Sequence, residues 1–299
     1  MRVFVTGATG ALGRRVVPAL VALGHHVTAI GRTPEKRSAL ERQGARPVDV
    51  DLFDPAALRP AVRGAEAVLN LATAVPAGMR GFLPWAWKPM DRIRTQASAN
   101  VVDAALAGDD VRLLVQESFA PIYDDGGDRW LDESSPVRPA RYNRSVLDAE
   151  ANADRFTRAG RTGVVLRFGL FYGPGDPFTL LLLDSVRRGW FPMFGDPEGY
   201  TSWISHEDAA SAVVAALGVP AGIYNAVDDQ PLRRRELAAG VARLLGIKPP
   251  RFLPAWTTSL AGTVGDALGR SLRISNRKLR QGSPWKPKHP TALEGLGAQ

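Results

Sequence analysis

Three glycines at the first strand-to-helix junction constrain this chain more than any other feature. The run Thr6-Gly7-Ala8-Thr9-Gly10-Ala11-Leu12-Gly13 follows a β-branched segment and opens a helical pattern. In this spacing the first glycine permits a tight turn, the second lets the backbone approach a pyrophosphate, and the third lets helix and strand pack closely. The helix N-terminus favours the negative charge of the phosphates. The turn predicts a dinucleotide site with contacts at Gly7, Thr9, Gly10, Ala11, Leu12 and Gly13.

Short apolar runs alternate with helical patterns around this turn. Strands are expected at Val3–Thr6, His25–Ile30, Pro47–Val50, Ala67–Leu71, Arg112–Gln116 and Gly163–Phe168, and helices at Ala11–Leu23, Pro34–Gln43, Pro55–Val62, Asp91–Ala107 and Arg141–Ala159. Strands separated by such helices indicate βαβ units and an α/β fold, a Rossmann-type doubly wound parallel sheet. We expect residues 1–168 to form the dinucleotide-binding domain. Residues 169–299 are expected to form mostly a smaller substrate lobe, partly interleaved with it.

Composition excludes several classes of protein. The 299 residues contain no cysteine, so disulfides and thiolate metal sites are excluded, and no metal is expected. There is no secretory leader pattern, and no apolar run approaches the ~20 residues that span a bilayer. A cytoplasmic protein without membrane contact is therefore expected. The net charge of +8 and the basic stretch from Arg270 to Lys288 are read as a solvated surface, because the interleaved aromatics of nucleic-acid binders are missing.

The end of the second strand bears on which dinucleotide is bound. A carboxylate at this place grips the ribose 2′-hydroxyl of NAD. The sequence here is Ile30-Gly31-Arg32-Thr33, with no acid. Arg32 can pair with a 2′-phosphate, which predicts NADP(H) as the cofactor. Asp51 and Leu52, just after the third strand, are expected to contact the adenine.

Motifs along the whole chain resemble one superfamily. Asn70-Leu71-Ala72 resembles the segment after the fourth strand that runs beside the cofactor, and so implies contacts at Leu71, Ala72 and Thr73. Further similar segments are Leu166 to Pro174, Trp203 to Ala212 and Tyr224 to Glu236. The chain resembles the extended or atypical short-chain dehydrogenase/reductases of the epimerase/dehydratase type. This resemblance implies the Rossmann fold, a small-molecule substrate and, as one option, a homodimer.

The catalytic residues depart from the pattern of that superfamily, which uses a tyrosine, a lysine four residues later and a serine. The resemblance assigns the tyrosine to Tyr142 and the serine to Ser118, with Phe119 as the alternative. The lysine position is Val146. A tyrosine without this lysine keeps a pKa near ~10, so it donates a proton or hydrogen bond and is a poor base. Other candidates for the catalytic acid are Tyr123, His206, Glu117 and Arg94.

Aromatic residues in the loops of the second half indicate an apolar or aromatic substrate. The expected substrate contacts are Trp85, Tyr123, Tyr172, Phe194 and Trp203. The sequence therefore predicts an NADP(H)-dependent oxidoreductase that acts on a moderately hydrophobic carbonyl or enone. The alternatives are a redox-silent NADP(H) sensor, a non-redox isomerase, cyclase or dehydratase, and, from charge alone, an RNA-binding relative.

Overall fold

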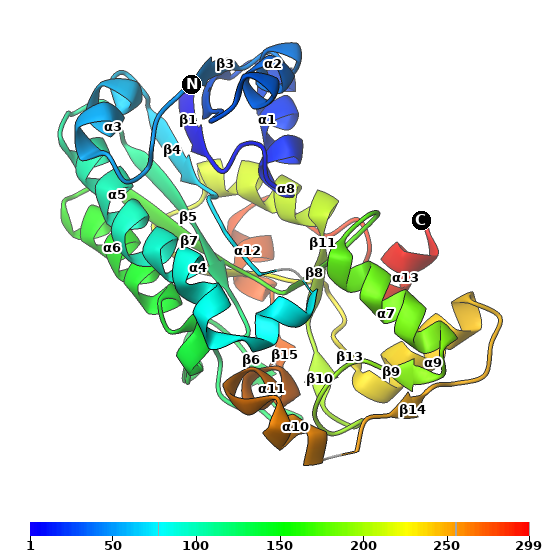
Figure 1. The fold of residues 1–299 in the computed structure, drawn as a ribbon. Helices are drawn as coiled ribbons and strands as arrows, with labels where there is room; N and C mark the ends of the chain where they lie inside the picture. The colour runs from blue at the N-terminus through cyan, green and yellow to red at the C-terminus, as the bar shows by residue number, and fades with distance from the viewer. Residues whose placement is uncertain (77, 255, 299) are drawn as a thin grey trace.

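A seven-stranded parallel sheet forms the centre of the protein (Figure 1). The computed structural model describes residues 1–76, 78–254 and 256–298. The strands, in spatial order, are β12 (Gly222–Ala226), β7 (Thr162–Phe168), β5 (Leu113–Phe119), β4 (Ala67–Asn70), β1 (Arg2–Thr6), β2 (His26–Ile30) and β3 (Arg46–Val48). The doubly wound Rossmann-type sheet predicted from the sequence is confirmed.

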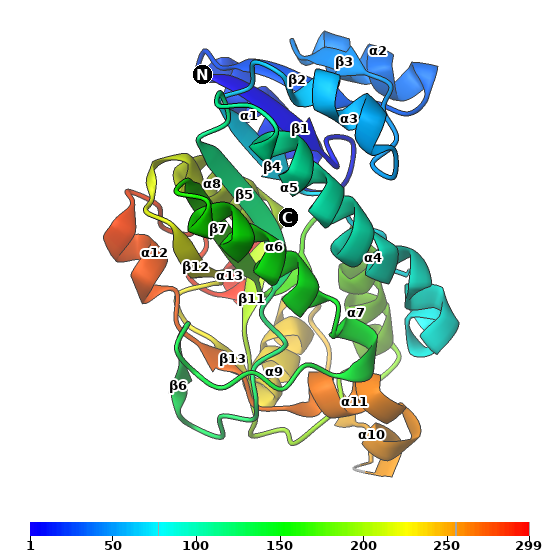
Figure 2. The same cartoon turned by 90° about the vertical axis from the view of Figure 1, so that its left-hand side faces the viewer.

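Helices cover both faces of this sheet. They are α1 (Gly13–Ala22), α2 (Pro34–Arg42), α3 (Pro55–Val62), α5 (Ser98–Leu106), α6 (Val146–Arg158) and α8 (His206–Ala215). One apolar layer joins the sheet to α1 and α8. The opposite layer joins it to α3, α5 and α6, of which α5 and α6 lie toward the viewer in Figure 2. Since α8 and β12 are part of these layers, residues 206–226 complete the N-terminal unit.

The direction of winding reverses between β1 and β4. The chain proceeds from β1 outward to β3, and then returns to place β4 on the other side of β1. Ligands of such sheets bind in the crevice at the carboxyl ends of the strands beside this reversal. Thr6 and Asn70 end the two strands and are paired in register, so they mark the place where a site is expected.

Two helices begin at least three residues away from their predicted starts. The helix expected over Asp91–Ala107 begins earlier, as α4 (Lys88–Arg92), and passes through a π-helical turn at Ile93–Ala97 before α5. The helix expected from Arg141 begins at Val146, after a short 3-10 segment, Arg141–Asn143. The Ser145 hydroxyl donates to an Asp91 carboxylate oxygen at 2.7 Å, which ties the start of α6 to α4. The spacing of apolar residues within a helix carries no information about such long-range contacts.

The second half adds a smaller lobe at the carboxyl edge of the sheet (Figure 1). Its helices are α7 (Pro177–Arg187), α9 (Arg234–Leu244), α10 (Trp256–Leu260), α11 (Gly262–Gly269) and α13 (Ala292–Gly297). Helix α12 (Arg277–Gly282) packs instead against β12 of the central sheet. Short strands pair two by two: β8 (Leu170–Tyr172) with β11 (Trp203–Ser205), β10 (Tyr200–Thr201) with β13 (Leu232–Arg233), β9 (Trp190–Phe191) with β14 (Arg251–Phe252), and β6 (Trp130–Leu131) with β15 (Arg273–Ile274). A separate apolar core joins α7, α9 and α13.

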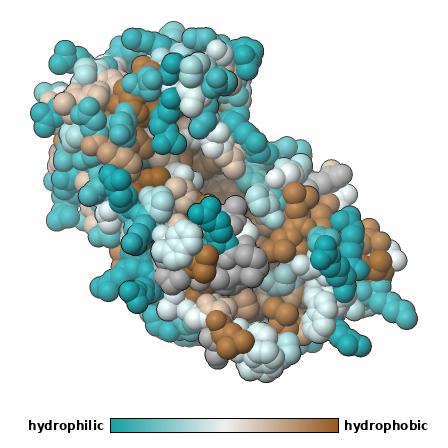
Figure 3. All heavy atoms as spheres, viewed as in Figure 1, coloured by the Kyte–Doolittle hydropathy of each residue, from teal (hydrophilic) through white to brown (hydrophobic). Residues whose placement is uncertain are grey.

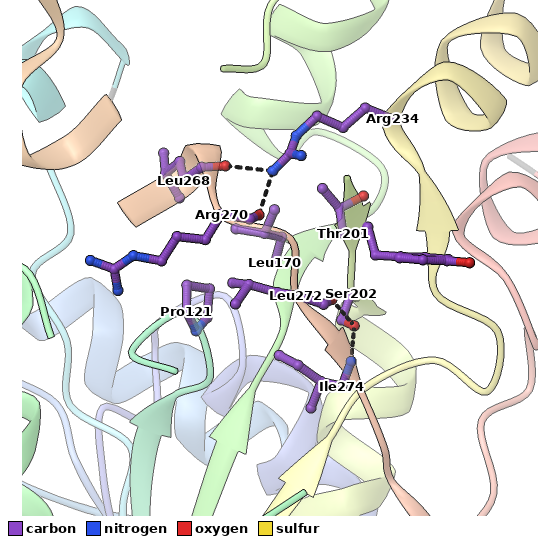
Figure 4. Close-up of a pocket in the computed structure, with 10 residues that line it drawn as sticks. Pro121, Leu170, Thr201, Ser202, Arg234, Leu268, Arg270, Leu272 and Ile274 are labelled. Atoms are coloured by element: carbon purple, nitrogen blue, oxygen red, sulfur yellow. Dashed lines mark hydrogen bonds between the residues drawn. The ribbon is translucent and has the colours of Figure 1, made fainter. Parts of the chain in front are cut away.

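Two buried arginines hold the segment after α11 in place. Figure 4 shows residues that line a small cavity here, and Arg234 donates to the carbonyl oxygens of Leu268 in α11 and of Arg270 after it, at 2.9 and 2.6 Å. Burial lowers the pKa of Arg234 to about 10. Arg270 in turn donates to the carbonyl oxygen of Tyr123 at 3.1 Å. These bonds fix the lobe against the loop that follows β5.

Candidate functional site

The glycine turn leaves no room for a side chain at its first position. Gly7 has φ +65°, and a Cβ there would lie 2.3 Å from the Leu71 carbonyl oxygen. A Cβ on Gly13 would lie 2.3 Å from the Gly7 carbonyl oxygen. Gly10 closes the turn by donating from its amide to the same oxygen at 3.0 Å, while its own surface stays exposed. Two of the glycines therefore serve packing, and the middle one keeps the backbone open to a ligand.

The N-terminus of α1 offers unused hydrogen-bond donors beside this turn. Within the described ranges, the amides of Ala11, Leu12 and Gly13 donate to no backbone or side-chain acceptor. Thr9 is half-buried and Ala11 is exposed. Free amides at a helix N-terminus next to a glycine cradle fit the pyrophosphate of a dinucleotide.

The end of β2 lies next to this cradle and carries positive charge. Arg32 is exposed, directly after Gly31. The neighbouring Arg37 is used structurally, because it donates to an Asp49 carboxylate oxygen at 2.7 Å and to the Gly31 carbonyl oxygen at 3.3 Å. Arg32 is thus the arginine at this strand end that is open to solvent and suited to a 2′-phosphate.

The residues expected at the adenine end lie after β3. The Asp51 side chain is exposed and accepts from the Phe53 amide at 3.0 Å. Asn100 of α5 donates to the Leu52 carbonyl oxygen at 3.0 Å, which holds this loop against the sheet. The loop is therefore shaped by protein contacts and leaves the Asp51 carboxylate at the surface.

A chain of buried polar groups crosses the carboxyl ends of three strands. The Thr6 hydroxyl donates to Asn70 Oδ1 at 2.6 Å, and Asn70 Nδ2 donates to Gln116 Oε1 at 2.8 Å. Asn70 leads into Leu71, Ala72 and Thr73, of which Leu71 is buried, Ala72 half-buried and Thr73 exposed. The chain of bonds therefore fixes the loop that the resemblance assigns to the cofactor.

Ser118 faces away from this loop. Its hydroxyl donates to Glu150 Oε1 at 2.6 Å, and Arg167 binds both Glu150 oxygens, at 2.8 and 2.7 Å. Ser118 has no exposed surface. Because alternate residues of a strand face opposite sides, Glu117 and Phe119 point the other way. The structure therefore places the hydroxyl of Ser118, the serine that the resemblance assigns to catalysis, in a buried network with Glu150 and Arg167.

Tyr142 lies in an apolar cluster beside the cofactor loop. Its ring centroid is 4.6 Å from that of Trp87, and Met90 packs into the same cluster. The Met90 sulfur accepts from the Ala74 amide at 3.1 Å, which joins this cluster to the loop after β4. Burial raises the pKa of Tyr142 to about 12, against the opposing effect of the Arg94 charge. Tyr142 is therefore neutral and able to donate. Val146, at the position of the family's lysine, is fully buried.

Arg94 and Glu117, two of the other candidates for the catalytic acid, form an ion pair near Tyr142. Arg94 Nη2 is 3.5 Å from Glu117 Oε1, and the two residues are 4 % and 7 % exposed. Burial raises the pKa of the Glu117 carboxyl, while the guanidinium of Arg94 lowers it and the nearby Glu150 raises it. The available signal is the polar run Gln116-Glu117-Ser118 at the end of an otherwise apolar strand.

His206, another alternative, is buried at the start of α8. Its Nε2 is 3.7 Å from Asp176 Oδ2, and its ring stacks on Phe171 with centroids 5.4 Å apart. Burial lowers the pKa of His206, with the Asp176 carboxylate opposing this effect. Ser205 is the residue that caps the helix, by accepting from the Asp208 amide at 2.9 Å. His206 thus packs between α8 and the loop after β8.

The aromatic residues expected at the substrate divide into two groups. Tyr123, Tyr172 and Trp203 are at most 1 % exposed. The Tyr123 hydroxyl donates to Asn225 Oδ1 at 2.8 Å, and the other two rings pack in the core of the lobe. The expectation for these three is corrected, because they are core residues with no free surface. Trp85 is 55 % exposed and Phe194 is half-buried, so both can meet a ligand.

Helix α7 also carries exposed hydrophobic side chains. Leu180 and Leu181 are exposed there. Figure 3 shows hydrophobic residues gathered over this helix, beside a hollow between the lobe and the N-terminal unit. A hollow with an apolar wall is typical of a small-molecule site.

The basic C-terminal segment is largely used within the protein. Arg273 lies over the rings of Trp130 and Tyr200, and Lys278 donates to the Ile223 carbonyl oxygen at 2.7 Å. Ion pairs join Arg280 to Asp229 and Lys288 to Glu207.

Among the described residues, no group of three or more histidines or acids is arranged to hold a metal. Every helix among the described residues is too short or too polar to cross a membrane.

Comparison with known proteins gives the same assignment as the geometry. Residues 7–169 match the family described as NAD(P)H-binding. A 3-diazoavenalumate denitrifying reductase from a Streptomyces species is 34% identical over 310 residues, which cover all of both chains. A 2-alkyl-3-oxoalkanoate reductase of Shewanella oneidensis is 25% identical, over 92% of this chain and 73% of the relative.

Solved structures agree in fold. The human epimerase family protein SDR39U1, crystallised with NADPH, aligns over 100% of this chain and 98% of its own, with a TM-score of 0.79 and 22% identity. The dTDP-glucose 4,6-dehydratase DesIV of Streptomyces venezuelae, crystallised with NAD and TYD, aligns over 100% and 95%, with a TM-score of 0.79 and 22% identity. The family match over residues 7–169 and the 34% identity to the Streptomyces reductase show that the chain belongs to the NAD(P)H-binding family, and the solved structures show that it shares the fold of epimerase/dehydratase-type proteins.

Proposed function

We propose that this protein is an NADP(H)-dependent oxidoreductase that reduces the carbonyl or enone of a moderately hydrophobic small molecule. The observation that carries this proposal is the Tyr142 cluster, a neutral phenol among apolar side chains, joined through Met90 to the loop after β4. A bound nicotinamide would supply the hydride. The two relatives named as reductases support the reaction class.

The preference for NADP(H) rests on Arg32. Its exposed guanidinium follows β2, where no carboxylate is available for a ribose 2′-hydroxyl. The residues proposed to hold the dinucleotide are the glycine turn, the amides of Ala11 and Leu12, and the loop from Leu71 to Thr73. Asp51 and Leu52 are proposed at the adenine.

The substrate is proposed to enter between the Tyr142 cluster and α7. Trp85 and Phe194 supply ring surface, and Tyr142 donates a hydrogen bond to the substrate oxygen. Such a wall favours an apolar or aromatic molecule over a sugar nucleotide. The test is a panel of ketones, aldehydes and enones with NADPH, followed as loss of nicotinamide absorbance in wild-type protein and in Tyr142→Phe. Turnover that Tyr142→Phe retains in full would remove Tyr142 from the mechanism.

A redox-silent NADP(H) sensor is the second candidate, favoured by the buried Val146 in place of the lysine. Tight NADPH binding without oxidation by any member of the panel would favour this function over the first. Turnover of one carbonyl compound at a rate proportional to protein concentration would exclude it.

A further inference from the structure

The Arg94–Glu117 pair contains unused hydrogen-bonding atoms in a buried place. Arg94 Nε and Glu117 Oε2 are both buried and have no hydrogen-bond partner among the described residues. At 3.5 Å the contact between Arg94 Nη2 and Glu117 Oε1 is longer than an ordinary charge-assisted hydrogen bond. Buried polar atoms without partners cost free energy, so their persistence calls for a role such as binding a ligand.

The register of the sheet places Glu117 at the level of the glycine turn. Thr6 pairs with Asn70, and Asn70 pairs with Gln116. The next residue on each of the three neighbouring segments is Gly7, Leu71 and Glu117. Since adjacent strands are about 4.8 Å apart, Glu117 lies roughly 10 Å from the pyrophosphate cradle, on the side of β5. That is the side on which the reactive end of a dinucleotide would lie.

Arg94 reaches this edge from the π-helical turn Ile93–Ala97. Such turns insert one extra residue into a helix and are frequent at functional sites. The turn is held by Ser98, whose hydroxyl donates to the Arg94 carbonyl oxygen and accepts from Asn152 Nδ2 of α6 at 2.7 Å. The helix distortion is therefore fixed by α6, and it holds the backbone of Arg94 in place.

We propose that Glu117 is the proton donor of the reduction and that Arg94 positions and tunes it, the pair replacing the tyrosine–lysine unit that Val146 interrupts. This inference rests on the proposed function. In the step, a bound reduced dinucleotide would supply the hydride for the new C–H bond, and the carbonyl π electrons would move to oxygen. That oxygen takes the Glu117 proton, and the carboxylate left beside Arg94 regains a proton from solvent.

Burial and neighbouring charges act on the Glu117 proton in opposite directions. Burial raises the pKa of this carboxyl, and Glu150 on α6 adds to the effect. The Glu150 carboxylate is itself neutralised by Arg167 of β7. Arg94 on the π-helical turn opposes burial. Tyr142, with a pKa raised to about 12, stays neutral and contributes a hydrogen bond. Burial and Glu150 therefore favour a proton on Glu117, and the Arg94 guanidinium opposes it.

Infrared spectroscopy of the ligand-free protein tests the protonation of Glu117 without any turnover. Wild-type protein is compared with Glu117→Gln, with Arg94→Gln and with Asp228→Asn, a control that removes another buried carboxyl whose pKa is raised. We expect Glu117→Gln to remove one protonated-carboxyl band that Asp228→Asn retains, and Arg94→Gln to move its titration to higher pH. A spectrum of Glu117→Gln that matches wild type at every pH would overturn the proposal.

Kinetics then test the proton transfer. With a carbonyl that wild-type protein reduces, we expect Glu117→Gln to lower kcat about 100-fold or more while the Kd for NADPH is unchanged. Asp228→Asn should keep the wild-type pH profile. If Glu117→Gln keeps wild-type kcat and pH profile, this inference fails and the oxidoreductase function stands. If wild-type protein reduces nothing in the panel, both fail.

Discussion

A Cβ on Gly7 would lie 2.3 Å from the carbonyl oxygen of Leu71, so the glycine turn and the loop after β4 are in direct backbone contact. Gly7→Ala must move one of them and also adopt φ +65°. We expect a loss of about 2–5 kcal/mol in the free energy of unfolding, the sum of backbone strain and overpacking. Gly64→Ala is the matched control, because φ there is +78° but nothing lies within 4 Å of the new Cβ. Its loss should be about 1–2 kcal/mol in the same urea titration.

Arg32→Ala should weaken NADPH binding and leave NADH binding unchanged. A charge-assisted hydrogen bond to a phosphate contributes roughly 1.5–3 kcal/mol, which corresponds to about a 10- to 100-fold rise in the Kd for NADPH. Arg42→Ala, at the other end of α2, should change neither affinity. An equal loss of affinity for both dinucleotides in Arg32→Ala would assign Arg32 to the shared part of the cofactor.

Glu150→Gln should destabilise the protein far more than a comparable change on the surface of the same helix. It leaves the buried Arg167 without a countercharge, which costs about 3–5 kcal/mol. Asp154→Asn breaks an exposed pair with Arg158 and should cost under about 0.5 kcal/mol. Chemical denaturation measures both, and similar values for the two variants would contradict a structural role for the Glu150 network.

The contribution of Glu117 to the free energy of unfolding should fall as pH rises. Burial raises its pKa in the folded state, so the unfolded chain releases this proton at lower pH. The stabilisation of the folded state by this proton is complete below the ordinary glutamate pKa and is lost as pH rises through the pKa of the folded state. Glu117→Gln removes this group. The difference in unfolding free energy between the variant and wild type should therefore move in favour of the variant with rising pH, and a constant difference would contradict the raised pKa.

Tyr142→Phe should lower kcat and leave folding intact. The ring keeps its contact with Trp87, so only the hydroxyl is lost. Removing one hydrogen bond to a developing oxyanion typically costs about 100-fold or more, and we expect at least a 10-fold loss because Glu117 supplies the proton. Tyr224→Phe, whose hydroxyl bonds to Pro220 on the loop before β12, is the control. Steady-state kinetics and thermal unfolding of both variants separate the two effects.

Local sequence predicts the first βαβ unit well because its signals are local. The glycine turn, the β-branched strand before it and Thr33 as the N-cap of α2 all act within a few residues. The start of α6 depends instead on the Ser145–Asp91 bond, between residues 54 positions apart. No periodicity in Arg141–Ala159 records that contact, so the predicted helix begins too early.

The candidate site shows the same division between local and distant causes. Ser118 and Glu117 are consecutive residues of β5, so their side chains face opposite sides of the sheet, Ser118 toward α6. Sequence alone does not determine which of the two faces α6. Tyr172 and Trp203 resemble exposed loop aromatics in sequence, yet α7, α9 and α13 cover them. The Arg94–Glu117 pair joins a π-helical turn to a strand end, and the sequence of neither element indicates that it contacts the other.

Titration of the wild-type protein with NADPH and NADH, followed by nicotinamide fluorescence, tests the central claim most directly. The account predicts that both bind at the glycine cradle and that NADPH binds at least about 10-fold more tightly, because Arg32 meets its 2′-phosphate. NADH binding equal to or tighter than that of NADPH would contradict the role of Arg32, and the absence of binding by either dinucleotide would contradict the site itself.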